Sequence, residues 1–410
     1  MFNLLENRWS RYFFSFVYFG PLFNFLNYDF NQILRKSFFS SELRRLKSNK
    51  RTRIASSISS AVSLYKVLQG GQKDGGIPDS TSFQFSKYVA GGSYPEVNGY
   101  IIPTLIDYSK LFNDKSVIRN IDKLKNFILS QQNEDGSFPG GAVGRFSGPS
   151  VFNSGQILHG LVLHYKHFKD DSIMSNIEAV ADWICTSQNK DGSWSKYNYK
   201  NLKRTYDSKV SQPLLEAYEI LNKEEYLSSA LKNLDFVISN QLDNGWFQNC
   251  DNSEGKNNEP LLHCIGYTTQ GLIESFKITK DKKYLKSAIK CLNRLLKIFE
   301  ERGTLLPGRF NYKWHPTVKT SCVTGCAQIS ICWIEIYNIL GIKRYRDAAF
   351  SMNQMLREIQ INSGNSKING FLPASFPFWG DYLPFKMNTW GVKYALDAWM
   401  LEYKLLSKND

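Results

Sequence analysis

The feature that most constrains this chain is a short segment that recurs along it. The segment reads Gln-Asn-Glu-Asp-Gly-Ser-Phe at 132–138, Gln-Asn-Lys-Asp-Gly-Ser-Trp at 188–194 and Gln-Leu-Asp-Asn-Gly-Trp-Phe at 241–247, and a degenerate copy begins at Gln72. Successive copies are 60, 56 and 53 residues apart, and a near-constant interval of this size is typical of repeated supersecondary units. The sequence therefore predicts an array of similar pieces.

Each copy has the chemistry of a helix end. Asp-Gly or Asn-Gly supplies the left-handed residue that terminates a helix, and the glutamine side chain can hydrogen-bond backbone groups freed at that end. The aromatic residues Phe138, Trp194 and Trp246 are expected to pack back as structural wedges. A single copy could be an ordinary turn, but three in register favour repeated helix ends.

Apolar periodicity and turn residues predict twelve helices. Their expected ranges are 52–69, 96–112, 116–131, 153–168, 174–188, 207–221, 225–240, 263–278, 282–300, 319–340, 344–358 and 388–406. Short connections follow the even-numbered helices, whereas the connections after the odd-numbered helices are far longer than the usual ~4–6 residues. In an up-and-down array all long loops then meet at one end. The even-numbered helices are the more apolar set, so we expect them to form an inner ring.

This pattern resembles the α/α toroids, which include squalene cyclases and protein prenyltransferases as well as six-hairpin glycosidases, polysaccharide lyases and uronyl epimerases. The resemblance covers residues 52–406 and implies an all-α (α/α)6 toroid of twelve alternating inner and outer helices. We expect this toroid domain to span residues 52–410, after an N-terminal extension over residues 1–51. The architecture carries several chemistries, so the resemblance alone does not choose an activity.

The N-terminal extension differs in composition from the rest of the chain. The net charge is +14, and residues 1–53 hold ten Lys/Arg against three acidic residues, together with the many aromatic residues between Trp9 and Phe25. This segment is too short and interrupted to span a bilayer. We expect an arm packed against protein, with peripheral contact to an anionic membrane surface as the alternative. No nucleic-acid-binding motif accompanies the charge, so no nucleic-acid partner is predicted.

The cysteine content bears on the cellular compartment. The chain has seven cysteines without paired spacing, which predicts reduced thiols and a cytoplasmic protein. The first residues lack the pattern of a signal peptide. Cys322 and Cys326 stand four apart on one helical face, but no ligand spacing accompanies them, so we expect small buried thiols. No metal and no cofactor is predicted.

Candidate catalytic residues come from the predicted starts of the inner helices. These helix N-termini would all point toward the long-loop end, where unpaired N–H groups and helix dipoles favour an anionic ligand. The candidates are Glu96, Asp207, His263 and Tyr267. His263 and Tyr267 share one helical face and could share proton transfer. The plainer alternatives are that Glu96 and Asp207 only stabilise helix starts and that His263 is a core histidine.

Candidate substrate-binding residues lie near the same helix starts. They are Tyr100, Tyr206, Arg309, Trp314, His315, Lys319, Asp381, Asn388, Trp390 and Lys393. In a lyase or epimerase, Arg309, Lys319 or Lys393 would neutralise a uronate carboxylate, with Asn388 beside it, while a Tyr or His removes the C5 proton.

A hydrolase would instead need two carboxylates, for which Glu96, Asp207 and Asp381 are the candidates.

The predicted function is that of a carbohydrate-active enzyme of polysaccharide or glycoconjugate metabolism. Its substrate would be an anionic oligosaccharide or glycolipid, and lyase, epimerase and hydrolase chemistry all stay open. One alternative is a terpene-cyclase-like or prenyltransferase-like toroid acting on an isoprenoid. The Asp-x-Asp-Asp motif of the cyclases is missing, and His263-Cys264 does not reproduce the prenyltransferase zinc site. The other alternative is a non-catalytic toroid that binds a glycan or a protein.

Overall fold

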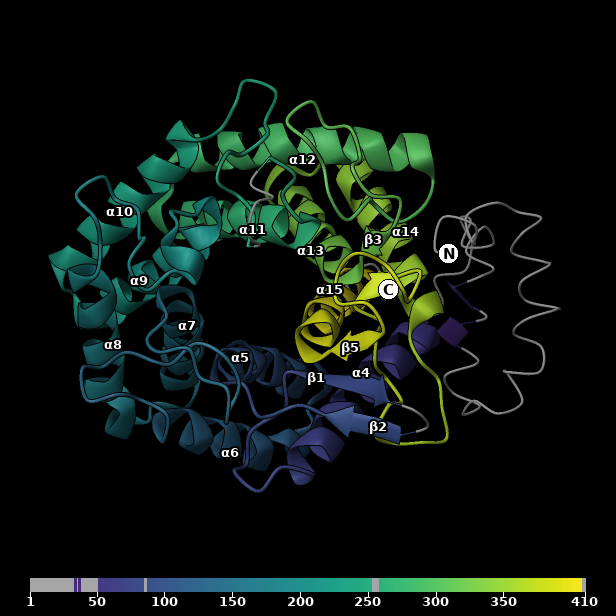
Figure 1. Cartoon of the computed structure of the whole chain (residues 1–410), viewed down its shortest axis with the longest axis horizontal. Helices are drawn as coiled ribbons and strands as arrows, with labels where there is room; N and C mark the ends of the chain where they lie inside the picture. Colours follow the sequence, from purple (N-terminus) through teal and green to yellow (C-terminus); the bar gives the residue numbers. More distant parts are fainter. Residues whose placement is uncertain (1–32, 35, 38–50, 85–86, 253–257, 408–410) are drawn as a thin grey trace.

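A double ring of helices forms the body of the protein in the computed structural model, which describes residues 33–34, 36–37, 51–84, 87–252 and 258–407. The inner ring consists of α5 (Pro95–Phe112), α7 (Val151–Phe168), α9 (Ser208–Leu221), α11 (Leu262–Thr279), α13 (Val323–Leu340) and α15 (Thr389–Ser407). The outer ring consists of α4 (Arg51–Gly70), α6 (Ile118–Leu129), α8 (Met174–Thr186), α10 (Glu224–Ser239), α12 (Lys282–Arg302) and α14 (Lys343–Ile359). Figure 1 shows the alternation of the two rings around one axis. The described part of the chain thus has the predicted (α/α)6 toroid fold.

The inner ring is closed. Each inner helix contacts the next one in sequence, and α15 returns to contact α5. The closest approach is between α5 and α7, where a Cβ placed on Gly160 would lie 2.1 Å from the carbonyl oxygen of Gly99. The all-round apolar helix α13 has the hydropathy and length of a membrane span, but 72% of it is buried inside the ring. Its composition is therefore that of a core helix in a packed toroid.

The recurring glutamines join neighbouring outer helices. Gln132 donates through Nε2 to the carbonyl of Gly136 in its own turn, at 3.0 Å, and to that of Asn176 in the next outer helix, at 3.1 Å. The same pair of bonds is made by Gln69, Gln188, Gln241 and Gln360. The first copy is therefore centred on Gln69 and not on Gln72 as predicted. Because Gln360 bonds the carbonyl of Ser57, this device also links the last outer helix to the first.

The aromatic residue of each recurring segment is a structural wedge, as expected. Phe138 and Trp194 are fully buried and Trp246 is 3% exposed. The indole of Trp194 donates to the carbonyl of Ile184 near the end of the preceding helix. The glycine of the turn is also required by packing, since Gly136 has φ 88° and a Cβ there would lie 2.4 Å from the carbonyl oxygen of Ala179. A side chain at this position would push the neighbouring outer helix away.

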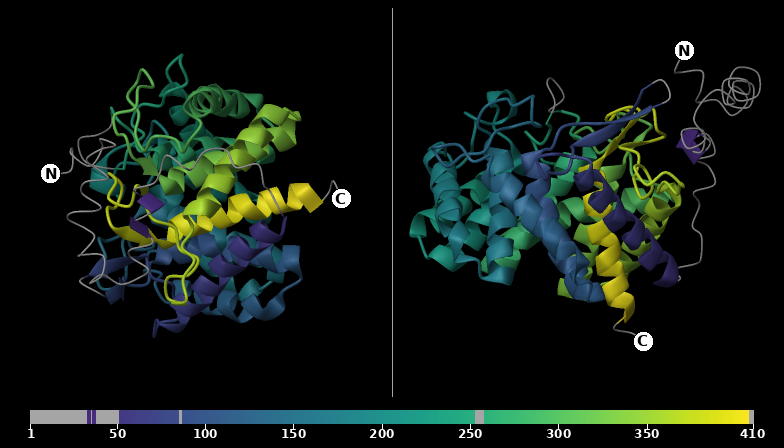
Figure 2. Two further views of the ribbon diagram at one scale, coloured as in Figure 1. Left: turned by 90° about the vertical axis from the view of Figure 1, so that its right-hand side faces the viewer. Right: turned by 90° about the horizontal axis from the view of Figure 1, so that it is seen from below.

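The long loops gather at one end of the toroid, and the short ones at the other (Figure 2). They contain the three-stranded antiparallel sheet β2 (Lys87–Ala90), β1 (Ser80–Gln84) and β5 (Lys386–Asn388), and the pair β3 (Ser321–Cys322) and β4 (Ser375–Phe376). Strand β1 pairs with β5 through Thr81 and Met387, so the first and last long loops close the ring on this face. Short 3-10 helices lie at Lys115–Val117 (η4), Asp171–Ile173 (η5), Tyr199–Asn201 (η6) and Thr205–Asp207 (η7).

Most of the N-terminal extension lies outside the described residues, including the aromatic and basic stretches on which the membrane alternative depends. Of the described part, Ile33 and Leu34 are buried among core residues. Lys36 donates to the carbonyls of Glu358 and Gln360. These contacts are those of a segment packed on the toroid.

Candidate active site

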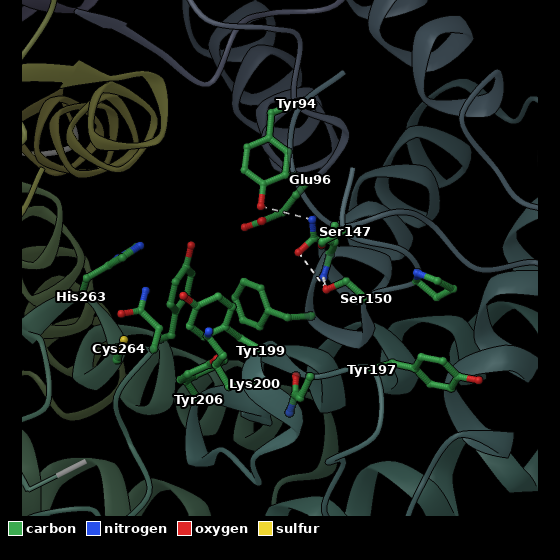
Figure 3. A pocket seen from close by; sticks show the side chains of 18 of the residues that line it. Tyr94, Glu96, Ser147, Ser150, Tyr197, Tyr199, Lys200, Tyr206, His263 and Cys264 are labelled. Carbon is green, nitrogen blue, oxygen red and sulfur yellow. Dashed lines mark hydrogen bonds between the residues drawn. The ribbon is translucent and has the colours of Figure 1, made fainter. Parts of the chain in front are cut away.

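A cavity of about 1020 Å³ lies at the long-loop end of the inner ring. Its lining comes from the starts of the inner helices α5, α7, α11 and α15, from η7 just before α9, and from the long loops between them. The lining residues that the sequence predicted are Glu96, Tyr100, Tyr206, His263, Tyr267 and Trp390. The structure therefore brings three of the four catalytic candidates into one space, as Figure 3 shows for Glu96 and His263.

Glu96 is a buried carboxyl group in the first turn of α5. It is 7% exposed, and burial raises its pKa to about 7, partly opposed by a hydrogen bond from the hydroxyl of Tyr94. Tyr94 is held in turn by Asn153, whose Nδ2 lies 3.2 Å from the tyrosine hydroxyl. A carboxyl group with a pKa near neutrality can both release and accept a proton, which is the property required of a general acid or base.

His263 opens α11 and presents a neutral imidazole to the cavity. Its Nδ1 lies 2.7 Å from Oε1 of the buried Gln328. An amide oxygen only accepts, so Nδ1 carries the hydrogen and Nε2 keeps its lone pair. Burial lowers the pKa of His263 to about 4. The imidazole is therefore an oriented, uncharged base at neutral pH.

Aromatic rings surround these two groups. The ring of His263 lies 4.3 Å from that of Tyr267 and 5.9 Å from that of Tyr382, measured between centroids. Phe152 packs edge-on against both Tyr206 and Tyr267, at 5.2 and 4.9 Å. Burial raises the pKa of Tyr267 well above its ordinary value, so its hydroxyl keeps its proton at neutral pH and can donate a hydrogen bond. The cavity combines flat apolar faces with hydroxyl groups, which suits a sugar ring.

The fourth catalytic candidate, Asp207, lies behind the cavity wall. It is fully buried, and burial raises its pKa to about 8. Nδ2 of Asn198, a lining residue, donates to Oδ2 of Asp207 at 2.6 Å. Asp207 also precedes α9 without capping it through its side chain. The structure therefore places it as a support for Asn198 and not in contact with a ligand in the cavity.

Arg309, Asp381, Lys393 and Asn388 do not line the cavity, in contrast to the prediction. Arg309 donates to both Asp251 and Asp381, at 3.0 and 2.6 Å. Lys393 pairs with Asp397 at 2.8 Å, and Asn388 donates to Thr324. The polar groups of these four residues thus bind other protein groups. Arg309, Asp381 and Asn388 have partners far away in the sequence, and the partner of Lys393 lies one helical turn along α15.

The remaining predicted binding residues, Trp314, His315 and Lys319, also lie away from the cavity. Trp314 is buried and its indole donates to the carbonyl of Asn244. His315 and Lys319 are exposed on the loop before α13. Helix α13 begins at Val323 and not at Lys319, so the residues expected at its N-terminus lie on the loop instead.

One further part of the lining, the loop before η7, was not predicted from the sequence. It contributes Lys196, Tyr197, Asn198, Tyr199, Lys200 and Asn201. Three of these residues have positive φ: Tyr197 at 68°, Lys200 at 61° and Asn201 at 53°. Non-glycine residues seldom adopt a positive φ, and no sequence pattern predicts it at these three positions. Ser150 and Asn153 at the start of α7 were also missed, although a Ser N-cap could have located the first of them.

The charge of the lining is uneven. Glu96 is the one acidic residue among the described lining residues, and Lys196 and Lys200 are basic. Within the described part of the chain no group of three His, Cys, Asp or Glu residues is arranged to hold a metal ion. Cys264 lines the cavity, but burial raises the pKa of its thiol well above the ordinary value. The groups able to move a proton at neutral pH are therefore Glu96 and His263, while the tyrosine hydroxyls can serve as hydrogen-bond donors.

Comparison with solved structures supports the fold assignment. The chain is similar to an unsaturated glucuronyl hydrolase specific for heparin, with a TM-score of 0.67 and 14% identity over 87% of this chain and 99% of the other. It is also similar to the unsaturated glucuronyl hydrolase of Bacillus sp., with a TM-score of 0.67 and 15% identity over 84% and 96% of the two chains. The cellobiose 2-epimerase of Bacillus thermoamylovorans has a TM-score of 0.66 and 10% identity over 85% and 99%. No protein-family model and no curated protein sequence matches the chain. At these identities the similarity establishes the shared α/α toroid fold.

Proposed function

We propose that this protein is a carbohydrate-active enzyme that acts on a uronate-bearing sugar chain by moving a proton at a ring carbon. The observation that carries the proposal is the meeting of a neutral histidine, a carboxyl group with a pKa of about 7 and buried tyrosine hydroxyls in one aromatic cavity. Perturbed titratable groups that converge in a cavity are typical of catalytic sites.

Three features favour an anionic sugar as the substrate. The cavity lies at inner-helix N-termini, whose unpaired N–H groups attract negative charge. Lys196 and Lys200 add positive charge to the lining. Some of the similar solved structures are named as unsaturated glucuronyl hydrolases, whose name refers to a uronic acid. An isoprenoid would leave this polar lining without hydrogen-bond partners.

The proton-transfer chemistry follows from the two central groups. Nε2 of His263 is the base that would take the C5 proton of a uronate, since that proton is acidified by the adjacent carboxylate. Glu96 is the partner acid. In an epimerase it would return a proton to C5 from the opposite face, and in a lyase it would protonate the departing oxygen at C4. The step at C5 is common to both reactions.

A two-carboxylate hydrolase is less well supported. Such an enzyme places two carboxyl groups on either side of the scissile bond. Asp207 is buried behind Asn198, which donates a hydrogen bond to it, and Asp381 accepts a hydrogen bond from Arg309. Neither aspartate lines the cavity, so neither can serve as the second carboxylate beside Glu96.

The test is solvent exchange at the sugar ring. Uronate-containing oligosaccharides are incubated with the protein in D2O, and the C5 position is followed by NMR while unsaturated products are followed by ultraviolet absorbance. Deuterium at C5 without cleavage indicates an epimerase, and absorbance indicates a lyase. His263→Gln should abolish either signal, whereas the matched change His315→Gln at an exposed histidine should preserve it. The absence of exchange, cleavage and binding with every uronate glycan would refute the proposal.

A further inference from the structure

We propose that the loop formed by residues 196–201 is a second sugar-binding subsite, which holds the unit next to the reacting uronate by stacking on Tyr199 and by pairing an acidic substituent with Lys196 and Lys200. This inference rests on the proposed function, because it extends the same cavity outward. The substrate would then be at least two sugars long, with a negative charge on the second sugar.

The loop is fixed to the body of the protein at its base. Asn198 is 6% exposed and donates both to the carbonyl of Trp194, at 3.2 Å, and to Asp207, at 2.6 Å. The carbonyl of Tyr197 accepts from the backbone N–H of Val151, at 3.1 Å. The loop is therefore tied to the start of α7 and to the turn before α9. Its outer residues are presented from a rigid base.

Tyr199 is the exposed aromatic residue of this loop. It is 54% exposed although it lines the cavity (Figure 3), so one side of its ring is open to solvent at the cavity wall. An exposed aromatic ring at the wall of a cavity offers a flat apolar face on which a ligand ring can stack. A sugar ring that leaves the inner part of the cavity would meet this ring next.

Two basic residues of this loop indicate the kind of sugar. Lys196 Nζ lies 4.7 Å from the ring centroid of Tyr197, and Lys200 Nζ lies 5.8 Å from that of Tyr199. Two ammonium groups, each over an aromatic ring of this loop, are complementary to a sugar that carries a carboxylate. A neutral sugar would gain only the stacking contact.

Tyr312 provides a matched control. It is 51% exposed, it lies on another loop, and Lys313 Nζ sits 5.5 Å from its ring centroid. It does not line the main cavity but a separate small hollow beside Trp246 and Asn249, and its backbone carbonyl accepts a hydrogen bond from Nδ2 of Asn244. Tyr312→Ala thus removes an equally exposed ring with a similar cation beside it.

The experiment measures binding by calorimetry with a uronate monosaccharide and with a two-unit uronate chain, in the His263→Gln background so that no turnover occurs. Tyr199→Ala should weaken binding of the two-unit chain by about fivefold to tenfold more than it weakens binding of the monosaccharide, the size of one aromatic contact. Tyr312→Ala should leave both affinities as they are. The double change Lys196→Gln with Lys200→Gln should remove the preference for a charged over a neutral second sugar and should flatten the salt dependence.

The outcomes are separable. Equal effects of Tyr199→Ala at both chain lengths, or the same loss in Tyr312→Ala, would overturn the subsite while leaving the proposed function intact. Failure of the His263→Gln protein and of the unmodified protein to bind any uronate chain would overturn the proposed function itself. Melting curves of each variant, followed by circular dichroism, show whether a loss of binding reflects unfolding.

Discussion

Replacing Glu96 with glutamine tests the electrostatic environment of the cavity directly. Glu96 is 7% exposed and lies in the second position of α5, where its neighbours at the cavity are mainly aromatic. Burial raises its pKa from 4.5 to about 7. Glutamine keeps the shape and an oxygen that can accept from Tyr94, but it carries no charge at any pH. The substitution therefore removes the cost of ionising a buried carboxyl group.

The sign of the effect follows from proton binding. Between pH 4.5 and about 7 the folded protein keeps the proton on Glu96 while the unfolded chain releases it. The folded state then binds more protons, so the contribution of Glu96 to the free energy of unfolding falls as pH rises through this window. At about 1.4 kcal/mol for each pH unit, the full loss is on the order of 3 kcal/mol above pH 7. Glu96→Gln should show none of this loss.

The assay is denaturant unfolding of the unmodified protein and of Glu96→Gln at about pH 5 and about pH 8. The variant should gain about 2–3 kcal/mol relative to the unmodified protein between the two pH values, because every other titrating group is common to both. The control Glu134→Gln removes the same charge from an exposed position. A stability difference between Glu96→Gln and the unmodified protein that is the same at both pH values would refute a buried, proton-retaining Glu96.

Three further substitutions test other parts of the structure. Gln328→Leu removes the acceptor that orients His263, so we expect turnover to fall by about tenfold or more, and 15N NMR of the imidazole should report a mixture of tautomers. Arg309→Leu leaves Asp251 buried without its 3.0 Å partner, and should lower the free energy of unfolding by about 3–5 kcal/mol in denaturant titrations. Gly160→Ala forces a methyl group against the backbone of α5, and should cost about 1–3 kcal/mol with a lower melting temperature. Unchanged turnover in Gln328→Leu would contradict the orientation of His263 by Gln328. Unchanged free energies of unfolding in Arg309→Leu and Gly160→Ala would contradict the buried ion pair and the close packing of the inner ring.

The fold could be predicted from the sequence because its determinants are local and repeated. Each recurring glutamine and glycine marks the end of one outer helix, and the hydrogen bonds of Gln132 to its own turn and to the next helix explain why the spacing is nearly constant. Gln360 escaped detection because its glycine partner, Gly370, lies ten residues further on. The glutamine at the first copy was misplaced, since Gln69 and Gln72 both precede the same turn.

The site was predictable only where a helix start fixes the position of a side chain. Glu96 and His263 lie in the first turns of inner helices, and this placement carries them to the cavity. Arg309 and Lys393 have the right chemistry, but carboxylates brought close by folding satisfy them. Tyr199 depends on a loop with several left-handed residues, a conformation that composition does not encode.

The proposed function requires the cavity at the starts of the inner helices to bind a uronate sugar between Glu96 and His263. A crystal structure of His263→Gln soaked with a four-unit uronate chain tests it most directly. We expect density for one uronate ring within hydrogen-bond distance of Glu96 and residue 263, with the next sugar over Tyr199. Density for the sugar elsewhere on the protein, with the cavity holding only solvent at a saturating concentration, would contradict it.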